Sequence, residues 1–165
     1  MTDAQWWIVL GMFLGGAIPW LEAIVVVPVG ILAGGPPVLV VLAALLGNLI
    51  TVWLFAVFGQ RARLWWIGRR QRRMEGSGKG PDPETQAKKH RRAERIDRVM
   101  KRWGLPGLAV LGPLGLGTQL SALAAVAMGA SSRAAFGWVA AGAAGWAVVA
   151  AVLAVTGRTF LGVGA

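Results

Sequence analysis

Residues 15–37, GGAIPWLEAIVVVPVGILAGGPP, are apolar enough to enter a membrane, yet they contain a glutamate, Glu22, and several helix breakers. Pro19 and Pro28 lack the backbone N–H that a helix interior needs, and glycine weakens a helix by about 1 kcal/mol relative to alanine. Non-helical backbone persists at membrane depth only where it is buried in protein or lines a wet cavity. We therefore expect residues 6–35 to form a broken element packed inside a membrane protein.

The distribution of charge along the chain favours a membrane location for most of it. Of the 165 residues, 56% are hydrophobic, whereas a soluble domain has about 45–50%. Residues 5–59 hold one ionisable group and residues 103–165 hold two, while residues 60–102 carry 15 of the 17 Lys and Arg. No basic residue precedes Trp6, which argues against a signal peptide. The sequence predicts an all-α integral membrane protein.

Four apolar runs cover residues 6–35, 38–59, 105–130 and 134–157. The second and fourth contain no proline and have the length of about 20 residues that one spanning helix needs. The third is interrupted by prolines and glycines, as the first is. We interpret the first and third runs as re-entrant helical hairpins. Their predicted breaks lie at Pro28, Pro113, Gly115 and Gly117.

The order of a broken segment followed by a whole helix occurs twice, which suggests an internal repeat. At an offset of 95, LAGGPP at 32–37 lies opposite AMGASS at 127–132, Gly47 lies opposite Gly142, and Gly117 lies opposite Glu22. We expect a single membrane domain, 1–165, made of two inverted repeats at 5–59 and 103–160. Hairpins that return to their own side put both termini outside, whereas fully crossing segments give four spans and both termini inside.

The basic stretch 60–102 is predicted to be a cytoplasmic loop, because loops rich in Lys and Arg stay inside. The same rule accounts for the net charge of +10 without a nucleic-acid partner, and it fits a multi-pass protein of the bacterial plasma membrane. Within the loop, residues 86–103 have the spacing of an amphipathic helix that lies on the inner membrane surface. Anionic lipid headgroups are the expected partners; the alternative is a solvated loop that only sets topology. The expected headgroup contacts are Arg69, Arg70, Arg72, Arg73, Arg91, Arg92 and Arg95.

A few polar residues at membrane depth are the candidates for function. Glu22 is costly there unless it is paired or protonated, and a buried carboxyl takes up a proton readily. Asn48 can bond across helices, or simply join helices without further function. Beside the second break, Thr118 and Gln119 can hold a polar or anionic group, or serve only packing. Together with Pro19, these residues form the predicted proton and substrate site.

Nothing in the sequence points to an enzyme or to a cofactor. There is no phosphate-binding loop of the Walker type and no nucleophile with a histidine partner. The chain has no cysteine and one histidine, so no metal site of the usual His and Cys type is expected.

The segments IPWLEAIVVVPVGILAGGPP, ALLGN and WGLPGLAVLGPLGLGTQLSALAAVAMGA resemble the bacterial small multi-drug export proteins. That family is similar in turn to the DedA superfamily, which implies two re-entrant hairpins, each packed against a transmembrane helix. It also implies proton-linked transport or the movement of phospholipid or polyprenyl-phosphate carriers. DedA proteins carry an arginine just after the proline of the second hairpin, whereas Leu114 follows Pro113 here. An arginine clamp for phosphate is therefore not implied.

Three functional hypotheses follow. The first is a small secondary transporter that exports an amphipathic substrate linked to protons, and the small size of the chain makes a homodimer plausible. The second is a lipid or polyprenyl-phosphate flippase or scramblase of the DedA type. The third is an accessory subunit of a larger membrane complex.

Overall fold

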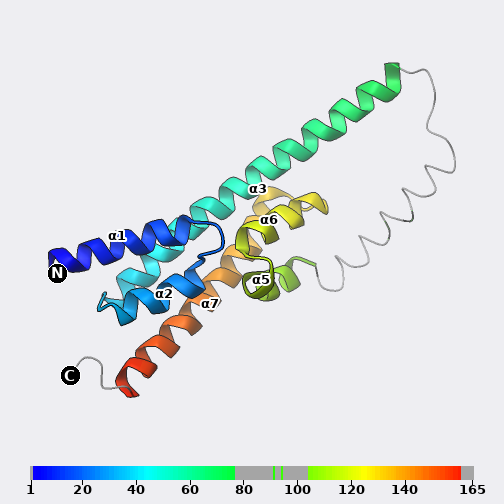
Figure 1. Cartoon of the computed structure of the whole chain (residues 1–165). Coiled ribbons are helices and arrows are strands. Elements are labelled where there is room, and N and C mark those ends of the chain that lie inside the picture. The colour runs from blue at the N-terminus through cyan, green and yellow to red at the C-terminus, as the bar shows by residue number, and fades with distance from the viewer. Residues whose placement is uncertain (1, 77–90, 92–93, 95–103, 161–165) are drawn as a thin grey trace.

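The computed structural model describes residues 2–76, 91, 94 and 104–160, which form helices joined by short turns, with no β-strand among them. The chain folds into two groups of helices that pack against each other (Figure 1). The first group is α1 (Asp3–Ala17), α2 (Ala23–Leu32) and α3 (Pro37–Gly76). The second group is α5 (Gly104–Gly115), α6 (Thr118–Ala127) and α7 (Ser132–Phe160).

The two long helices are the candidate membrane spans. Pro37–Arg72 of α3 and the whole of α7 are long and apolar enough to cross a bilayer. They run in opposite directions, since α3 begins near the end of the molecule at which α7 finishes (Figure 1).

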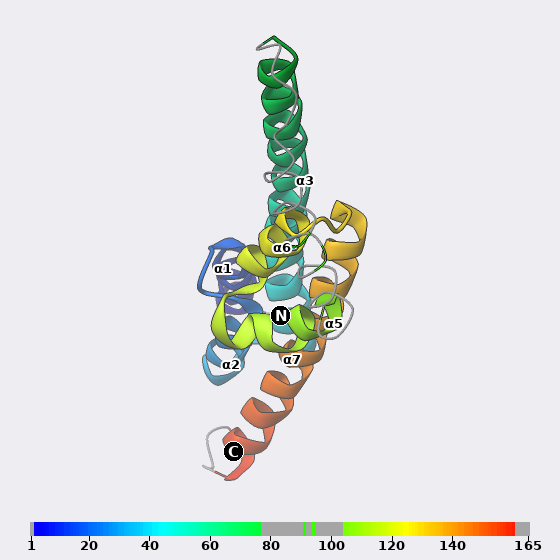
Figure 2. The same cartoon turned by 90° about the vertical axis from the view of Figure 1, so that its right-hand side faces the viewer.

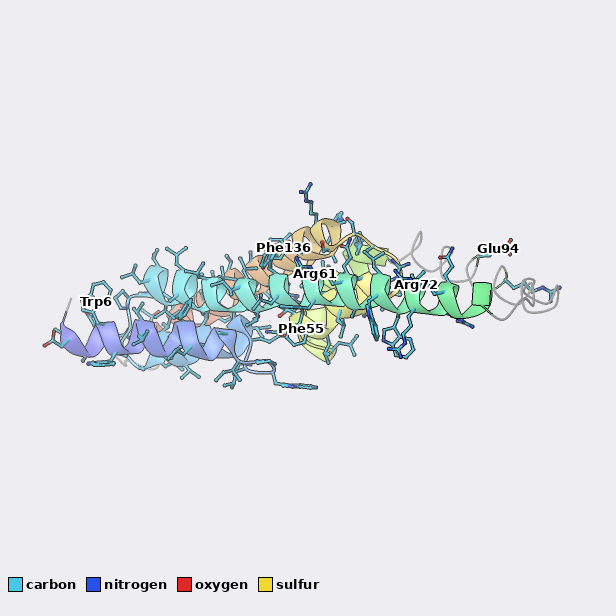
Figure 3. All side chains as sticks on the ribbon, turned by 90° about the horizontal axis from the view of Figure 1, so that it is seen from above. Trp6, Phe55, Arg61, Arg72, Glu94 and Phe136 are labelled. Carbon is cyan, nitrogen blue, oxygen red and sulfur yellow. The ribbon has the colours of Figure 1, made fainter. Side chains whose placement is uncertain are left out.

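Helix α3 is much longer than the predicted run 38–59, because it continues without a break to Gly76. At about 1.5 Å per residue its 40 residues extend about 60 Å, twice the hydrocarbon thickness of a bilayer. Residues 61–74 contain no proline and include six arginines, and arginine is a good helix former. The first part of the basic stretch is thus a rigid extension that projects beyond the other helices (Figures 2 and 3). In Figure 3, Arg72 lies near its far end and Trp6 of α1 at the opposite end of the molecule.

The apolar runs at 6–35 and 105–130 are both broken, as predicted. Some of the residues predicted as breaks, however, lie inside helices. Residues 18–22 separate α1 from α2, and Leu116 and Gly117 separate α5 from α6. Pro28 is not at a break, because it lies inside α2, and Pro113 likewise lies inside α5. Proline is tolerated within membrane helices where neighbouring helices compensate for the lost hydrogen bond. Here Pro28 faces α7, where it lines a shallow cavity together with Trp146 and Leu153.

Both short helices after the breaks end in the same kind of turn. Gly34 follows α2 with φ 90°, and Gly129 follows α6 with φ 114°, a conformation that suits glycine. The Gly34 N–H donates to the Ile31 carbonyl at 3.1 Å, and the Gly129 N–H donates to the Val126 carbonyl at 3.0 Å. Gly34 and Gly129 are 95 positions apart in the sequence, and so are Ile31 and Val126.

Close helix packing also occurs at positions that are 95 residues apart. A Cβ on Gly47 would lie 2.0 Å from the Phe13 carbonyl oxygen, which joins α3 to α1. A Cβ on Gly142 would lie 2.0 Å from the Ala109 carbonyl oxygen, which joins α7 to α5. Small residues at helix contacts are how membrane helices approach closely.

The buried core consists mainly of alanine and valine and forms two clusters. One cluster joins α2 and α3 to α7, and the other joins α3 to α6 and α7. Each cluster therefore contains residues from both halves of the chain, so the halves are held together by a shared core. The residues are Ala23, Val26, Val27, Ile31, Val40, Ala44, Ala147 and Ala154 in the first, and Val52, Ala56, Ala122, Ala125, Val126, Ala135 and Val139 in the second.

Candidate functional site: a buried polar cluster between two helix breaks

Glu22 lies at the point where the two breaks meet. It is the N-cap residue of α2, and its side chain is only 4% exposed. Its Oε1 accepts a hydrogen bond from the Thr118 backbone N–H in the first turn of α6. Glu22 therefore precedes α2 in the first half of the chain, and its carboxyl group caps α6 in the second half. The break before Glu22 includes Trp20, a non-glycine residue at φ 81° whose side chain is 75% exposed.

Gly117, the N-cap of α6, allows this close approach. It has φ 87°, and a Cβ at this position would lie 3.0 Å from Glu22 Oε1. Any larger residue would be strained in this conformation and would press against the carboxyl group. The predicted break at Gly117 is thus also part of the surroundings of Glu22, whereas Gly115 is the last residue of α5 and has nothing close to it.

Asn48 joins the same cluster from the middle of α3. Its side chain is fully buried, and its Oδ1 accepts hydrogen bonds from Thr118 Oγ1 and Gln119 Nε2, both at 3.0 Å. Thr118 Oγ1 also lies 3.1 Å from Gln119 Oε1, so its single proton can serve only one of these two acceptors at a time. Asn48, Thr118 and Gln119 thus form one network that links α3 to α6.

Thr51 is a member of this network that the sequence analysis missed. It accepts a hydrogen bond from Gln119 Nε2 at 3.2 Å and donates to the Asn48 carbonyl oxygen at 2.8 Å. The signal was present in the sequence, because residues three apart share a face of a helix and Thr51 follows Asn48 by three. Pro19 lies in the first break. Among the described residues, no hydrogen bond joins it to the network.

Two atoms of the cluster stay without a hydrogen-bond partner among the described residues. These are Glu22 Oε2 and Asn48 Nδ2, and both are buried. In the arrangement that the structure shows, Asn48 Oδ1 faces the two donors, and Nδ2 is the amide atom that stays without a partner. Buried polar groups without partners are rare, so each of these two atoms needs a partner such as a water molecule, an ion or a ligand.

Two helix N-termini meet at this cluster, because Glu22 caps α2 and Gly117 caps α6. The exposed N–H groups and the helix dipole give each N-terminus a partial positive charge. The cluster therefore attracts negative charge, and the Glu22 carboxyl group is the acidic group that supplies it.

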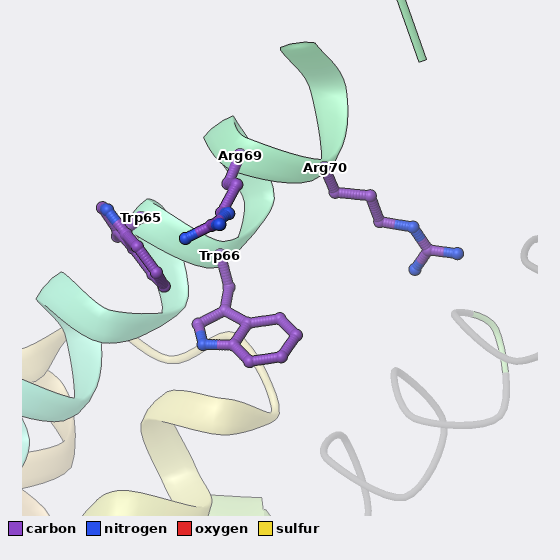
Figure 4. Close-up of a pocket in the computed structure, with 4 residues that line it drawn as sticks. All are labelled: Trp65, Trp66, Arg69 and Arg70. Carbon is purple, nitrogen blue, oxygen red and sulfur yellow. The ribbon is translucent and has the colours of Figure 1, made fainter. Parts of the chain in front are cut away.

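The arginines on the extension of α3 form a second, surface feature (Figure 4). Arg69 stacks on Trp65, with its guanidinium carbon 5.1 Å from the ring centroid, and Trp66 meets Trp65 edge to face. With Arg70 they line a cavity of about 430 Å³. Arg72 and Arg91 are exposed. The side chains of Arg73, Arg92 and Arg95, and the helix expected over 86–103, lie outside what the structure describes in full.

The described residues contain no group of three or more His, Cys, Asp or Glu that could hold a metal ion. The fold and the cluster instead define a class of protein: a helical membrane protein whose broken helices meet at a buried polar centre. The model of the family described as "Putative small multi-drug export protein" matches residues 22–149, and the chain belongs to this family. No curated protein and no solved structure matches the chain. The family description names export and not catalysis, so transport is the general function that it supports.

Proposed function

We propose that the protein is a secondary transporter that exports a small amphipathic substrate in a proton-linked cycle, with Glu22 as the group that gains and loses the proton. The observation that carries this proposal is the buried Glu22 carboxyl group bonded to the first turn of α6. Burial of a carboxyl group at membrane depth costs free energy. Ionisable groups that persist there mark ion and substrate pathways. Proton exchange on a side chain requires no enzymatic step and no cofactor.

The architecture we propose is a pair of inverted repeats. The matched turns at Gly34 and Gly129 and the matched close contacts at Gly47 and Gly142 support it, as do the opposite directions of α3 and α7. At about 1.5 Å per residue the ten-residue helices α2 and α6 reach about 15 Å, half of the bilayer core. Hairpins that return to their own side therefore fit better than full crossings, and they leave α3 and α7 as the two spans.

In this architecture the cluster lies near the midplane, where broken helices of secondary transporters hold substrates and coupling ions. Loss of the negative charge on Glu22 would weaken its bond to the Thr118 N–H, because a charged acceptor binds more strongly than a neutral one. The contact between the two halves would then loosen at its centre. Protonation thereby becomes the event that allows the halves to move against each other.

We further propose that the basic stretch 60–102 faces the cytoplasm, with both termini outside, and that the cell membrane of a bacterium is the location. The stacked Trp65 and Arg69 on the extension of α3 favour contact with lipid headgroups there, because tryptophan and arginine both prefer the interface. Arg70 and Arg72 are exposed beside them and are available for the same contact.

The test of the proton role is flux of an amphipathic dye from proteoliposomes under an imposed pH gradient. Glu22→Gln keeps the size of the side chain but cannot be ionised, so we expect gradient-driven flux to be lost. Thr156→Val is the matched control, because this exposed threonine bonds only within its own helix. Equal flux from Glu22→Gln and the wild type would refute the proton role. Single cysteines at Asp3 and Gly164, labelled from outside in cells, test the proposed topology, since the native chain has no cysteine.

A further inference from the structure

We infer that the N-terminus of α6 is a binding site for an oxyanion, either a carboxylate or a phosphate headgroup, and that the carboxylate of Glu22 occupies this site until it is protonated. The inference deepens the proposed function, because it gives the transported substrate a negative headgroup, and its transport step rests on that function. Binding of the anion does not depend on transport and can be tested alone.

The donor at the centre of this site already holds a carboxylate. The Thr118 N–H donates to Glu22 Oε1, and the glycine before it has no side chain that would keep an oxygen away. A helix N-terminus binds carboxylates and phosphates by the same N–H groups and the same dipole. Glu22 is therefore a resident anion, and another oxyanion of similar size can take its place.

A second donor is independent of the helix end. Asn48 is fully buried, and its Nδ2 has no hydrogen-bond partner among the described residues. The Asn48 oxygen is bonded to the Thr118 hydroxyl, so the free amide nitrogen lies beside the first turn of α6. An oxyanion has several lone pairs and can accept from both Thr118 and Asn48, whereas a cation would find the Asn48 amide with its oxygen already engaged.

Other charged side chains on the surrounding helices are remote from Glu22 along their helices. Asp3 begins α1, the arginines of α3 start at Arg61, and Arg133 and Arg158 lie near the two ends of α7. Helices α2, α5 and α6 carry no charged residue. Because two negative charges repel each other at one site, binding of the oxyanion favours protonation of Glu22, and protonation favours binding of the oxyanion.

The exchange balances in charge. A proton binds to the Glu22 carboxylate, the neutral carboxyl group releases the Thr118 N–H, and the oxyanion accepts the hydrogen bond in its place. Release of the oxyanion and of the proton restores the starting state. One proton is therefore bound with each negative headgroup, so the loaded centre, with neutral Glu22 and the oxyanion, carries the same net charge of −1 as the empty centre with ionised Glu22.

The experiment is thermal unfolding of the full chain in detergent, with sodium acetate, sodium phosphate or sodium chloride at equal ionic strength. Glu22→Ala removes the resident carboxylate, so its unfolding temperature should rise with acetate or phosphate until saturation and should not rise with chloride. Glu22→Gln imitates the protonated carboxyl group, so either anion should also stabilise it, at a pH where the ionised wild type does not respond. Thr156→Val is the matched control, because this exposed threonine bonds only within its own helix, and it should respond as the wild type does. In the wild type, the rise should grow as the pH is lowered. The larger effect of acetate or of phosphate then tells which headgroup the site prefers.

The inference is wrong if neither anion stabilises Glu22→Ala more than chloride does, or if Glu22→Gln responds no more than the wild type does at neutral pH. Stabilisation by tetramethylammonium chloride instead would assign a cation to the site and would equally overturn it. If Glu22→Ala does not fold, the wild type at low pH gives the answer, and Asn48→Asp should reduce its response to anions. This outcome differs from failure of the transport proposal, which is unchanged flux in Glu22→Gln.

Discussion

Replacement of Gly142 by alanine should push α5 and α7 apart. The added Cβ would lie 2.0 Å from the Ala109 carbonyl oxygen, and an ordinary contact begins at 3.4 Å, so the helices must separate by 1.4 Å. The obstacle is backbone and cannot rotate aside, which puts the cost at the upper end of overpacking, about 3 kcal/mol. Alanine returns about 1 kcal/mol through its helix propensity. The expected loss is therefore about 2 kcal/mol, or about a thirtyfold change in the folding equilibrium.

The assay is reversible unfolding in mixed micelles, followed by helical circular dichroism. Gly145→Ala is the matched control, because it lies one turn further along α7 and has no atom within 4 Å of an added Cβ. We expect the control to be unchanged or stabilised by up to about 1 kcal/mol. Gly47→Ala should lose about as much as Gly142→Ala, since its Cβ would meet the Phe13 carbonyl oxygen at the same 2.0 Å. If Gly142→Ala proves as stable as Gly145→Ala, the close packing of α5 on α7 is wrong.

Three further predictions concern the cluster and the ends of the short helices. Thr51→Val removes an acceptor of Gln119 Nε2 and should cost about 0.6 kcal/mol in the same unfolding assay, and no loss would mean that this bond is not formed in the membrane protein. Gly117→Ala forces a side chain into φ 87° and should cost about 1–2 kcal/mol, and a smaller cost would argue against the left-handed turn. Arg158→Gln removes the guanidinium that donates to the Ile31 carbonyl at 3.4 Å. Hydrogen exchange should then quicken at the end of α2 and stay unchanged in α6, and a uniform change would contradict a local role.

Local sequence signals predicted most of the helical pattern and the polar residues of interest. Hydrophobicity and proline located the two long helices, and the rarity of polar residues at depth singled out Glu22, Asn48, Thr118 and Gln119. The structure brings these four residues to one point. Their meeting depends on how the two halves dock, which involves residues 70 to 96 positions apart and leaves no local signal.

The differences between expectation and structure have similar causes. Pro28 reads as a break in the sequence, yet packing of α2 against α7 keeps the helix intact around it. The chain turns at residues 18–22, which include the other predicted breaker, Pro19, and there Trp20 has a positive φ that no local preference predicts. Charge suggested that the membrane helix stops at Gly59, but arginine ends the apolar segment without ending a helix. The end of an apolar segment therefore does not predict the end of a helix.

The bond between Glu22 and Thr118 also sets a condition on the synthesis of the protein. The two residues are 96 positions apart, and at a translation rate of about 5–20 residues per second the ribosome needs about 5–20 s to cover that distance. During this interval the first three helices have been made, while the helix end that receives the Glu22 carboxyl group does not yet exist. The nascent chain must therefore keep an acidic group at or near the bilayer surface, or protonated, until its partner arrives. We therefore expect stable insertion of the first half only after the second half has emerged.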